Sequence, residues 1–311
     1  MKSNTEGTLA RFIIFGLVAA LGLLAVGELV SRYVLGLGTP PLSVTHPRIE
    51  YLFAPDQDVS RFGNRQLYNE YGMRSLPVSD WPSGKRILVL GDSVLNGGNL
   101  TDHADLATTE AQDLSETAVF GNVSAGSWGI DNMLGWVETF GTLDAQAVIL
   151  VLSSHDAKDV PSFRGLNPRT HPTEGPNSAL SELISRYGVR YLPASLRPLR
   201  PDLQPIETSH VGRSGIEALP LLLDLFSMRD IRSCLVLHAE RREMTSNDFS
   251  GLDPFQELAV SAGVPTVLLP EVLMAEGADL DAVFRDEIHI TNVGQDYLRS
   301  ALLQCERALA Q

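Results

Sequence analysis

The chain has 311 residues, of which 44% are hydrophobic, so it can bury the core of one large α/β domain or two small ones. Its formal net charge of −14 would repel nucleic-acid phosphates, and we therefore expect no nucleic-acid partner. Of the two cysteines, neither belongs to a CxxC motif or a cysteine–histidine cluster, which argues against a structural zinc site. We expect Cys234 and Cys305 to be reduced packing residues.

The N-terminal region predicts a membrane anchor over residues 1–37. Residues 12–27 carry no charge, and such a run is close to the roughly 20 residues that span a bilayer. Lys2 and Arg11 precede it, which favours a cytoplasmic N-terminus. We expect a single-pass anchor in the inner (plasma) membrane, with the rest of the chain on the extracytoplasmic side. The alternative is a signal peptide cleaved near the small residues "AVG".

A connector over residues 38–83 follows the anchor. It contains prolines and aromatic residues but few long periodic runs. We expect an extended arm packed on the following domain, with one short strand.

The third region, residues 84–311, alternates apolar runs with helical patterns. The predicted strands are residues 86–91, 118–126, 147–154, 233–238 and 264–269. The predicted helices lie around residues 105–116, 132–141, 216–228 and 253–262, with a last helix at 292–309 capped by Thr291. Near-continuous apolar strands alternating with helices predict a doubly wound parallel sheet covered on both faces.

Residues 157–215 interrupt this alternation. Prolines are concentrated there, although residues 178–187 keep a helical pattern. We interpret this region as an insertion over one end of the sheet, where loops after the strand ends line the ligand site of α/β folds.

Chemistry-bearing residues follow the ends of the predicted strands. Ser93 stands after the first strand, in "LVLGDSVLNGG", and a nucleophilic serine needs a base and a group that orients the base. Asp286 and His289, in "FRDEIHI", have the spacing that lets a carboxylate hold one imidazole nitrogen while the other faces the serine.

Two further loops offer groups that could stabilise an oxyanion. Gly126 and Gly129, in "SAGSWG", follow the second strand and could present backbone N–H groups, or they could be turn glycines. His155 and Asp156, in "LSSHDAKD", follow the third strand and could equally cap that loop.

These motifs resemble the SGNH hydrolases, the GDSL-like lipase and esterase superfamily, over roughly residues 84–311. The resemblance implies a flavodoxin-like sheet, a nucleophile at Ser93 within G-D-S, and Asp286 and His289 as the D-x-x-H pair. It also implies an oxyanion hole made by the N–H groups of Ser93 and Gly129, with Gly126 as the weaker match for the glycine.

One motif departs from the superfamily pattern. Where G-x-N-D is expected, the chain reads Ser153-Ser154-His155-Asp156, so His155 replaces the oxyanion-binding asparagine. A neutral imidazole can donate one hydrogen bond, and we expect His155 to act in that form. Asp92 and Asp156 are expected to support the site.

The predicted function is a serine esterase that removes small acyl groups from an ester-bearing small molecule or an acylated cell-surface glycan. The Ser–His–Asp mechanism requires no metal and no organic cofactor. The glycan substrate is implied by the resemblance alone. One alternative is an O-acyltransferase that uses the same triad. The other is a weakly active or inactive protein with this fold that binds or assembles part of a polysaccharide machinery.

Overall fold

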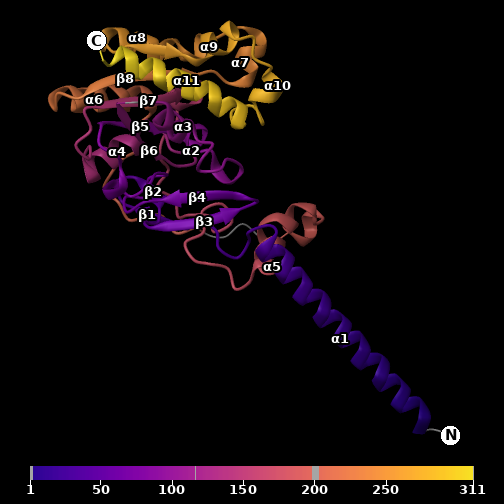
Figure 1. The fold of residues 1–311 in the computed structure, drawn as a ribbon. Coiled ribbons are helices and arrows are strands. Elements are labelled where there is room, and N and C mark those ends of the chain that lie inside the picture. The colour runs from indigo at the N-terminus through magenta and orange to yellow at the C-terminus, as the bar shows by residue number, and fades with distance from the viewer. Residues whose placement is uncertain (1–2, 116, 198–202, 311) are drawn as a thin grey trace.

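The computed structural model describes residues 3–115, 117–197 and 203–310. A long N-terminal helix, α1 (Ser3–Tyr33), projects away from the rest of the chain, two small hairpins follow, and the C-terminal region forms a layered α/β unit (Figure 1). One stretch of α1, Arg11–Tyr33, is long and apolar enough to cross a membrane, with a mean hydropathy of 2.5.

The α/β unit is built on a five-stranded parallel sheet. Its strands are β5 (Lys85–Gly91), β6 (Ala118–Ser124), β7 (Ala147–Ser153), β8 (Arg232–His238) and β9 (Thr266–Leu268). Their spatial order is β6-β5-β7-β8-β9, in which the chain reverses direction across β5 as it does in flavodoxin-like sheets. All residues of β6 and β7 are buried, which explains why these strands read as continuous apolar runs. The predicted fold class is confirmed.

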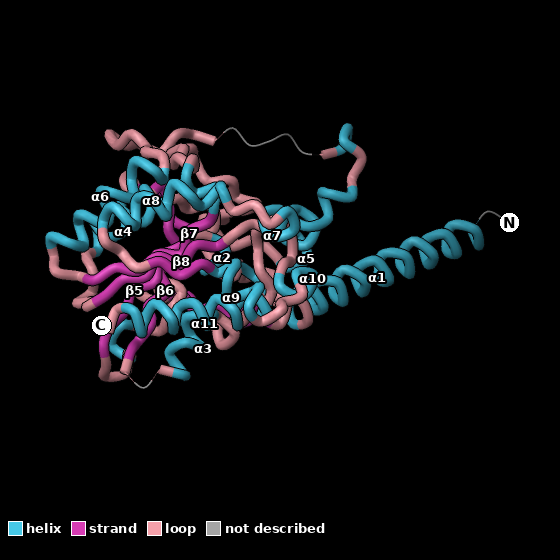
Figure 2. The backbone as a smooth tube through the Cα atoms, turned by 90° about the horizontal axis from the view of Figure 1, so that it is seen from above, coloured by secondary structure: helices cyan, strands magenta, loops and turns pink. Residues whose placement is uncertain are grey.

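Helices cover both faces of the sheet, as the view along the layers shows (Figure 2). One face packs against α4 (Ile130–Phe140), α6 (Gly215–Met228) and α8 (Asp253–Ala262). The other face packs against α3 (Ala107–Leu114), α9 (Leu269–Ala275) and α11 (Asn292–Ala308). Shorter helices are α2 (Ser93–Asn96), α5 (Ala179–Glu182), α7 (Arg241–Ser246) and α10 (Leu280–Val283).

The connector contains two hairpins, where the sequence predicted one short strand. They are β1 (Ser43–His46) with β2 (Glu50–Phe53), and β3 (Gln57–Arg61) with β4 (Asn64–Tyr68). Phe62 and Gly63 form the second turn with positive φ angles of 51° and 84°, the backbone of a two-residue hairpin turn. Phenylalanine rarely adopts this backbone, so the sequence carried little signal for the turn. Tyr51 and Leu52 bury their side chains in the main core.

The base of α1 contacts the insertion. The carboxylate of Glu28 accepts hydrogen bonds from the backbone N–H groups of Ala179 (3.1 Å) and Leu180 (2.8 Å), which begin α5. A few residues further on, Glu182 forms a buried ion pair with Arg61 of the second hairpin. The anchor, the connector and the insertion are therefore joined by polar contacts at one place.

The two cysteines correct a further prediction, because they form a disulfide. Cys234 of β8 and Cys305 of α11 are bonded, with their Cα atoms 5.8 Å apart and a separation of 71 positions in the sequence. Both were expected to be reduced because each reads as an ordinary core position. Only the packing of α11 against the sheet brings them together.

Candidate active site

The candidate site lies at the carboxyl end of the sheet. Ser93 follows β5, His155 follows β7, and Asp286 and His289 belong to the loop before α11. A cavity of about 160 Å³ opens at Ser93 and is also lined by residues of the connector and the insertion, among them Tyr51, Tyr68, Gly126 and His171.

Ser93 is held at the first position of a short helix. β5 ends at Gly91, where a side chain is excluded because a Cβ atom would lie 2.8 Å from Cβ of Leu95. Asp92 then caps α2, with its Oδ1 atom accepting a hydrogen bond of 2.8 Å from the N–H of Val94. Strand end, cap and helix thus fix the direction of the Ser93 side chain.

The loop that carries Asp286 and His289 is closed on itself. Phe284 and Ile290 form an isolated antiparallel bridge, and the N–H of Arg285 donates to the carbonyl of His289 (2.8 Å). Inside the loop, Oδ1 of Asp286 accepts backbone hydrogen bonds from Ile288 (2.9 Å) and His289 (2.7 Å). The carboxylate therefore holds its own turn in shape.

The structure brings Ser93, His289 and Asp286 together in a relay. Nε2 of His289 lies 3.0 Å from Oγ of Ser93, and Nδ1 lies 2.8 Å from Oδ2 of Asp286. Both distances are within hydrogen-bond range for a nucleophile, a base and an orienting carboxylate. With Nδ1–H donated to Asp286, the unprotonated Nε2 can accept the hydroxyl proton.

Electrostatics keep Asp286 ionised. Partial burial acts to raise the pKa of its carboxyl group, but the backbone hydrogen bonds from His289 and Ile288 and the contact with the imidazole outweigh it, so the pKa is lowered. Asp286 is consequently an acceptor throughout the neutral pH range, as an orienting carboxylate must be.

Gly129 does not lie where the sequence analysis expected it. Its N–H donates to Oδ1 of Asn132 (2.8 Å) at the start of α4, so it completes a helix cap instead of facing the serine. Gly126, the weaker motif match, is the glycine that lines the cavity with Ser93. Among the residues that the structure describes, the backbone N–H groups of Ser93 and Gly126 have no protein acceptor.

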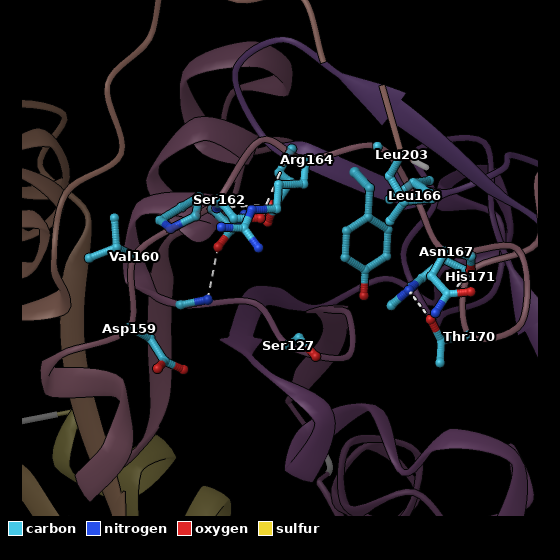
Figure 3. Close-up of a pocket in the computed structure, with 16 residues that line it drawn as sticks. Ser127, Asp159, Val160, Ser162, Arg164, Leu166, Asn167, Thr170, His171 and Leu203 are labelled. Carbon is cyan, nitrogen blue, oxygen red and sulfur yellow. Dashed lines mark hydrogen bonds between the residues drawn. The ribbon is translucent and has the colours of Figure 1, made fainter. Parts of the chain in front are cut away.

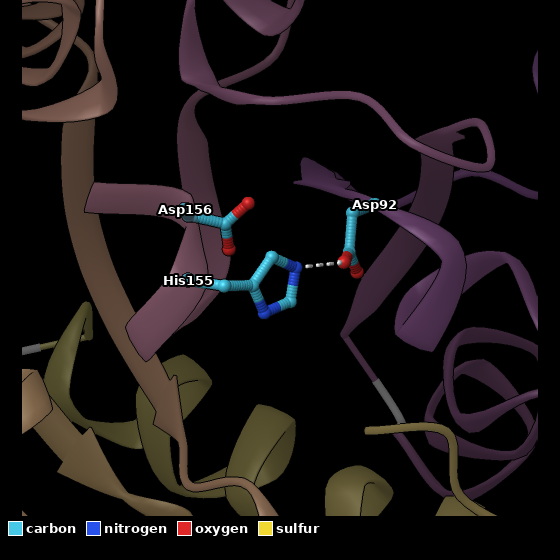
Figure 4. A group of neighbouring side chains, drawn as sticks. All are labelled: Asp92, His155 and Asp156. Carbon is cyan, nitrogen blue, oxygen red and sulfur yellow. Dashed lines mark ion pairs between the residues drawn. The ribbon is translucent and has the colours of Figure 1, made fainter. Parts of the chain in front are cut away.

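His155 also differs from its expected state. Burial acts to lower its pKa, but the neighbouring carboxylates of Asp92, Asp156 and Asp159 outweigh it and raise the pKa to about 9. Its Nε2 lies 3.4 Å from Oδ2 of Asp92 (Figure 4). Its Nδ1 lies 3.4 Å from Oε1 of Glu240. His155 is therefore a cation at neutral pH that pairs with carboxylates, not the neutral oxyanion donor that the motif comparison predicted.

Asp92, His155 and Asp156 form the one group in the described part of the chain whose ligand-type atoms could surround a metal ion, all lying within 4.8 Å of one another. Asp156 is fully buried, and its Oδ2 accepts the N–H of Ser153 (2.6 Å). Burial and the charge of Asp92 raise the pKa of Asp156 well above its usual range. The imidazole ring of His155 lies in this group, and its Nε2 is 3.4 Å from Oδ2 of Asp92.

The sequence analysis missed one residue that supports the site. His238, the last residue of β8, is fully buried and its Nε2 lies 3.0 Å from the carbonyl of Ile288, in the loop that carries His289. Burial lowers the pKa of His238, so the ring is neutral and its Nε2–H donates to that carbonyl. A polar residue ending the apolar run "CLVLH" was the available signal.

A second cavity of about 430 Å³ adjoins the first. The two share Tyr51, Thr170 and His171 in their linings. Polar side chains, including those of Asp159, Ser162, Arg164 and Asn167, surround the larger cavity (Figure 3). Most of its lining comes from the insertion, whose position over the sheet the sequence predicted but whose side chains it did not assign.

Comparisons with known proteins give likenesses of fold. Neither a protein-family model nor a curated protein sequence matches the chain. A solved structure of a lipolytic G-D-S-L family member from Veillonella parvula is 12% identical with a TM-score of 0.42, over 71% of this chain and 97% of that one. A GDSL-like lipase from Bacteroides thetaiotaomicron is 14% identical with a TM-score of 0.39, over 72% and 89%. A two-domain esterase active on acetylated mannans is 11% identical with a TM-score of 0.45, over 73% and 49%.

The chain's own features define its relationship most clearly. G-D-S ends β5, D-x-x-H precedes α11, and the strand order is that of a flavodoxin-like sheet. In motif order and in the placement of Ser93, Asp286 and His289, the chain is similar to the SGNH, or GDSL-like, hydrolases.

Proposed function

We propose that the chain is a serine esterase. The observation that carries this proposal is the relay from Ser93 Oγ to His289 Nε2 (3.0 Å) and from His289 Nδ1 to Asp286 (2.8 Å) at a cavity. Oγ of Ser93 attacks the ester carbonyl while His289 takes its proton. The imidazolium then returns that proton to the leaving alcohol, which departs and leaves an acyl-serine. Water activated by His289 releases the acid.

The oxyanion is stabilised by the backbone N–H groups of Ser93 and Gly126. Both belong to residues that line the same cavity, and neither has a protein acceptor in the described residues. Backbone donors of this kind need no reorganisation during the reaction, and each is worth on the order of 100-fold or more in turnover. His155 acts on the nucleophile indirectly. It pairs with Asp92, which caps the helix that starts at Ser93.

An acylated glycan is the substrate class that the cavities suit. The small cavity of about 160 Å³ at Ser93 matches a short acyl group. The adjoining cavity of about 430 Å³ offers hydroxyl, amide, guanidinium and carboxylate groups together with the ring of Tyr51, which suit a sugar's hydroxyl groups and ring face. One of the structurally similar proteins is an esterase active on acetylated mannans.

Acyl transfer is the second candidate, and the adjoining cavity is the observation that favours it. This polar cavity adjoins the cavity of Ser93 and shares lining residues with it. A sugar bound there could offer a hydroxyl group to the acyl-serine in place of water. Incubating the full chain with an aryl acetate and an acetyl-free oligosaccharide distinguishes the two. Acetylated oligosaccharide indicates transfer, and free acetate alone indicates hydrolysis.

We further propose that α1 anchors the chain in the inner membrane with the α/β unit outside the cytoplasm. The Cys234–Cys305 disulfide supports this, because disulfides persist mainly in oxidising compartments. The apolar stretch Arg11–Tyr33 supports membrane insertion. An alkaline phosphatase reporter fused after the last residue should be active, whereas activity of a cytoplasm-dependent fluorescent reporter at that place would contradict this orientation.

Turnover by the full chain in detergent tests the esterase proposal. We expect hydrolysis of short-chain aryl esters and acetylated oligosaccharides, lost in Ser93→Ala. Ser261→Ala is the matched control, because this exposed hydroxyl on α8 bonds only within its own helix (2.8 Å to the carbonyl of Glu257). Equal turnover by Ser93→Ala and the parent would reject the proposal.

A further inference from the structure

Residues 183–197, here called the basic segment, differ in charge from the rest of the chain. The whole chain has 38 acidic and 24 basic residues. The basic segment contains Arg186, Arg190 and Arg197 and no acidic residue. It forms short turns of π- and 3₁₀-helix directly after α5.

The basic segment also exposes large apolar side chains. Ile184 is 59% exposed, Tyr191 is 76% exposed and Leu196 is 66% exposed. The guanidinium of Arg190 lies over the ring of Tyr191, 4.9 Å from its centroid. Cationic and apolar groups mixed on one exposed segment are typical of elements that lie in a membrane interface.

The position of α5 beside α1 fixes where the basic segment begins. Glu28 of α1 accepts the N–H groups of Ala179 and Leu180. At Gly27, a Cβ atom would lie 3.4 Å from Cδ1 of Leu180, so the two helices pack closely there. Ile184 follows only four residues after Leu180. The basic segment therefore starts beside residues 27–28 of the candidate membrane span. Figure 1 shows α5 at this end of α1.

The length of the uncharged run places residues 27–28 at the edge of the bilayer. Residues 12–27 carry no charge and, at about 1.5 Å per helical residue, extend about 24 Å. The hydrocarbon core of a bilayer is about 30 Å thick, so lipid reaches at least as far as the point where α5 contacts α1. The chain that continues from α5 is then at the depth of the lipid headgroups.

We propose that the basic segment lies on the membrane surface and binds anionic phospholipid headgroups. Arg190 and Arg197 contact the headgroups, while Ile184, Tyr191 and Leu196 enter the interface. Arg186 is instead held inside the protein by its ion pair with Glu182 (3.0 Å). This second contact with the membrane requires α1 to span the bilayer but not the esterase activity. Arg186 also lines the cavity of Ser93, so the contact fixes how that cavity is oriented above the membrane.

Spin labels on the full chain in nanodiscs test the proposal. The native cysteines are joined in a disulfide, so Ile184→Cys and Leu196→Cys each provide one labelling site. Val260→Cys is the matched control, because Val260 is 79% exposed on α8, away from α1 (Figure 1). In discs that contain anionic lipid, the labels at 184 and 196 should collide more with oxygen than with a water-soluble nickel chelate. The label at 260 should show the reverse.

The charge contribution is tested by Arg190→Gln with Arg197→Gln in the Leu196→Cys background. In anionic discs, the water-exposed population of the label should rise on the order of fivefold for each arginine removed. The same substitutions should have little effect in neutral discs.

Three results would overturn the proposal. The labels at 184 and 196 could be as accessible to the nickel chelate as the label at 260, which would place the segment in water. They could be shielded from both oxygen and nickel, which would mean that protein covers the segment. The chain could fail to insert into discs, which would remove the anchor on which the contact depends.

Discussion

Nε2 of His289 lies 3.0 Å from Oγ of Ser93, although the two residues are 196 positions apart in the chain. Ser93 is placed by the end of β5 and His289 by a loop closed through the Phe284–Ile290 bridge. Their contact therefore depends on how α11 docks against the sheet. Asp286 orients His289 in this contact, and the Cys234–Cys305 disulfide links α11 to the sheet.

Asp286→Asn should lower kcat about 10³–10⁴-fold with little change in KM. The amide Nδ2 would face Nδ1 of His289, which favours the tautomer that has its proton on Nε2 and so cannot accept from Ser93. Steady-state kinetics on an aryl acetate measure this. Glu287→Gln, which removes one exposed charge at the next position, should keep parental turnover. Similar kinetics for the two variants would contradict the orienting role of Asp286.

His155→Gln should lower the free energy of unfolding in a pH-dependent manner. Carboxylates raise the folded-state pKa of His155 to about 9 from an ordinary value of 6.5, so its charge stabilises the fold fully below pH 6.5. This stabilisation is lost as the pH rises through about 9. Urea unfolding at pH 6 and at pH 9.5 should show a large difference between parent and variant only at the lower pH.

The control for this comparison is His46→Gln. Burial and the charge of Arg48 lower the pKa of His46. The loss of stability caused by His46→Gln should therefore not become smaller between pH 6.5 and 9. A His155→Gln defect of equal size at both pH values would mean that His155 acts through packing and not through its charge.

Reduction of the disulfide should lower the free energy of unfolding by about 2–4 kcal/mol, because the bond restricts a 71-residue loop of the unfolded chain. Cys305→Ala should behave in the same way as reduction of the parent. Urea unfolding with and without a phosphine reductant measures the change. Detection of two free thiols in the unreduced, denatured protein would show that the bond does not form.

The sheet could be predicted from the sequence because its strands are buried on both faces. The runs "RILVLG" and "AVILVLSS" match β5 and β7 within a residue, and the N-cap at Thr291 is confirmed by its contact with the N–H of Gly294 (3.4 Å). Local patterning and capping chemistry are sufficient for such elements. For the connector, the sequence predicted one short strand where the structure has two hairpins, because strands of four or five residues and a Phe-Gly turn show little recognisable pattern.

The site was harder to predict where contacts outside the motifs set the chemical state of a group. The spacing of Asp286 and His289 predicts their contact, and the resemblance to the SGNH hydrolases implies their role beside Ser93. The charge of His155 depends on Asp92, more than 60 positions earlier, and Gly129 is turned away by Asn132. Asp92 meets His155 only through the fold, so no pattern near His155 indicates this partner. Asn132 follows Gly129 by three positions, and its capping of α4 was a local signal that the motif comparison overlooked.

Covalent labelling of Ser93 tests the central claim most directly. The full chain is treated with an aryl fluorophosphonate, which reacts only with an activated serine, and the site is read by peptide mass spectrometry. We predict one phosphonate per chain, on Ser93, with labelling slowed at least about 100-fold in Asp286→Asn and abolished in Ser93→Ala. An unlabelled chain, or a label on another serine that persists in Ser93→Ala, would contradict the account.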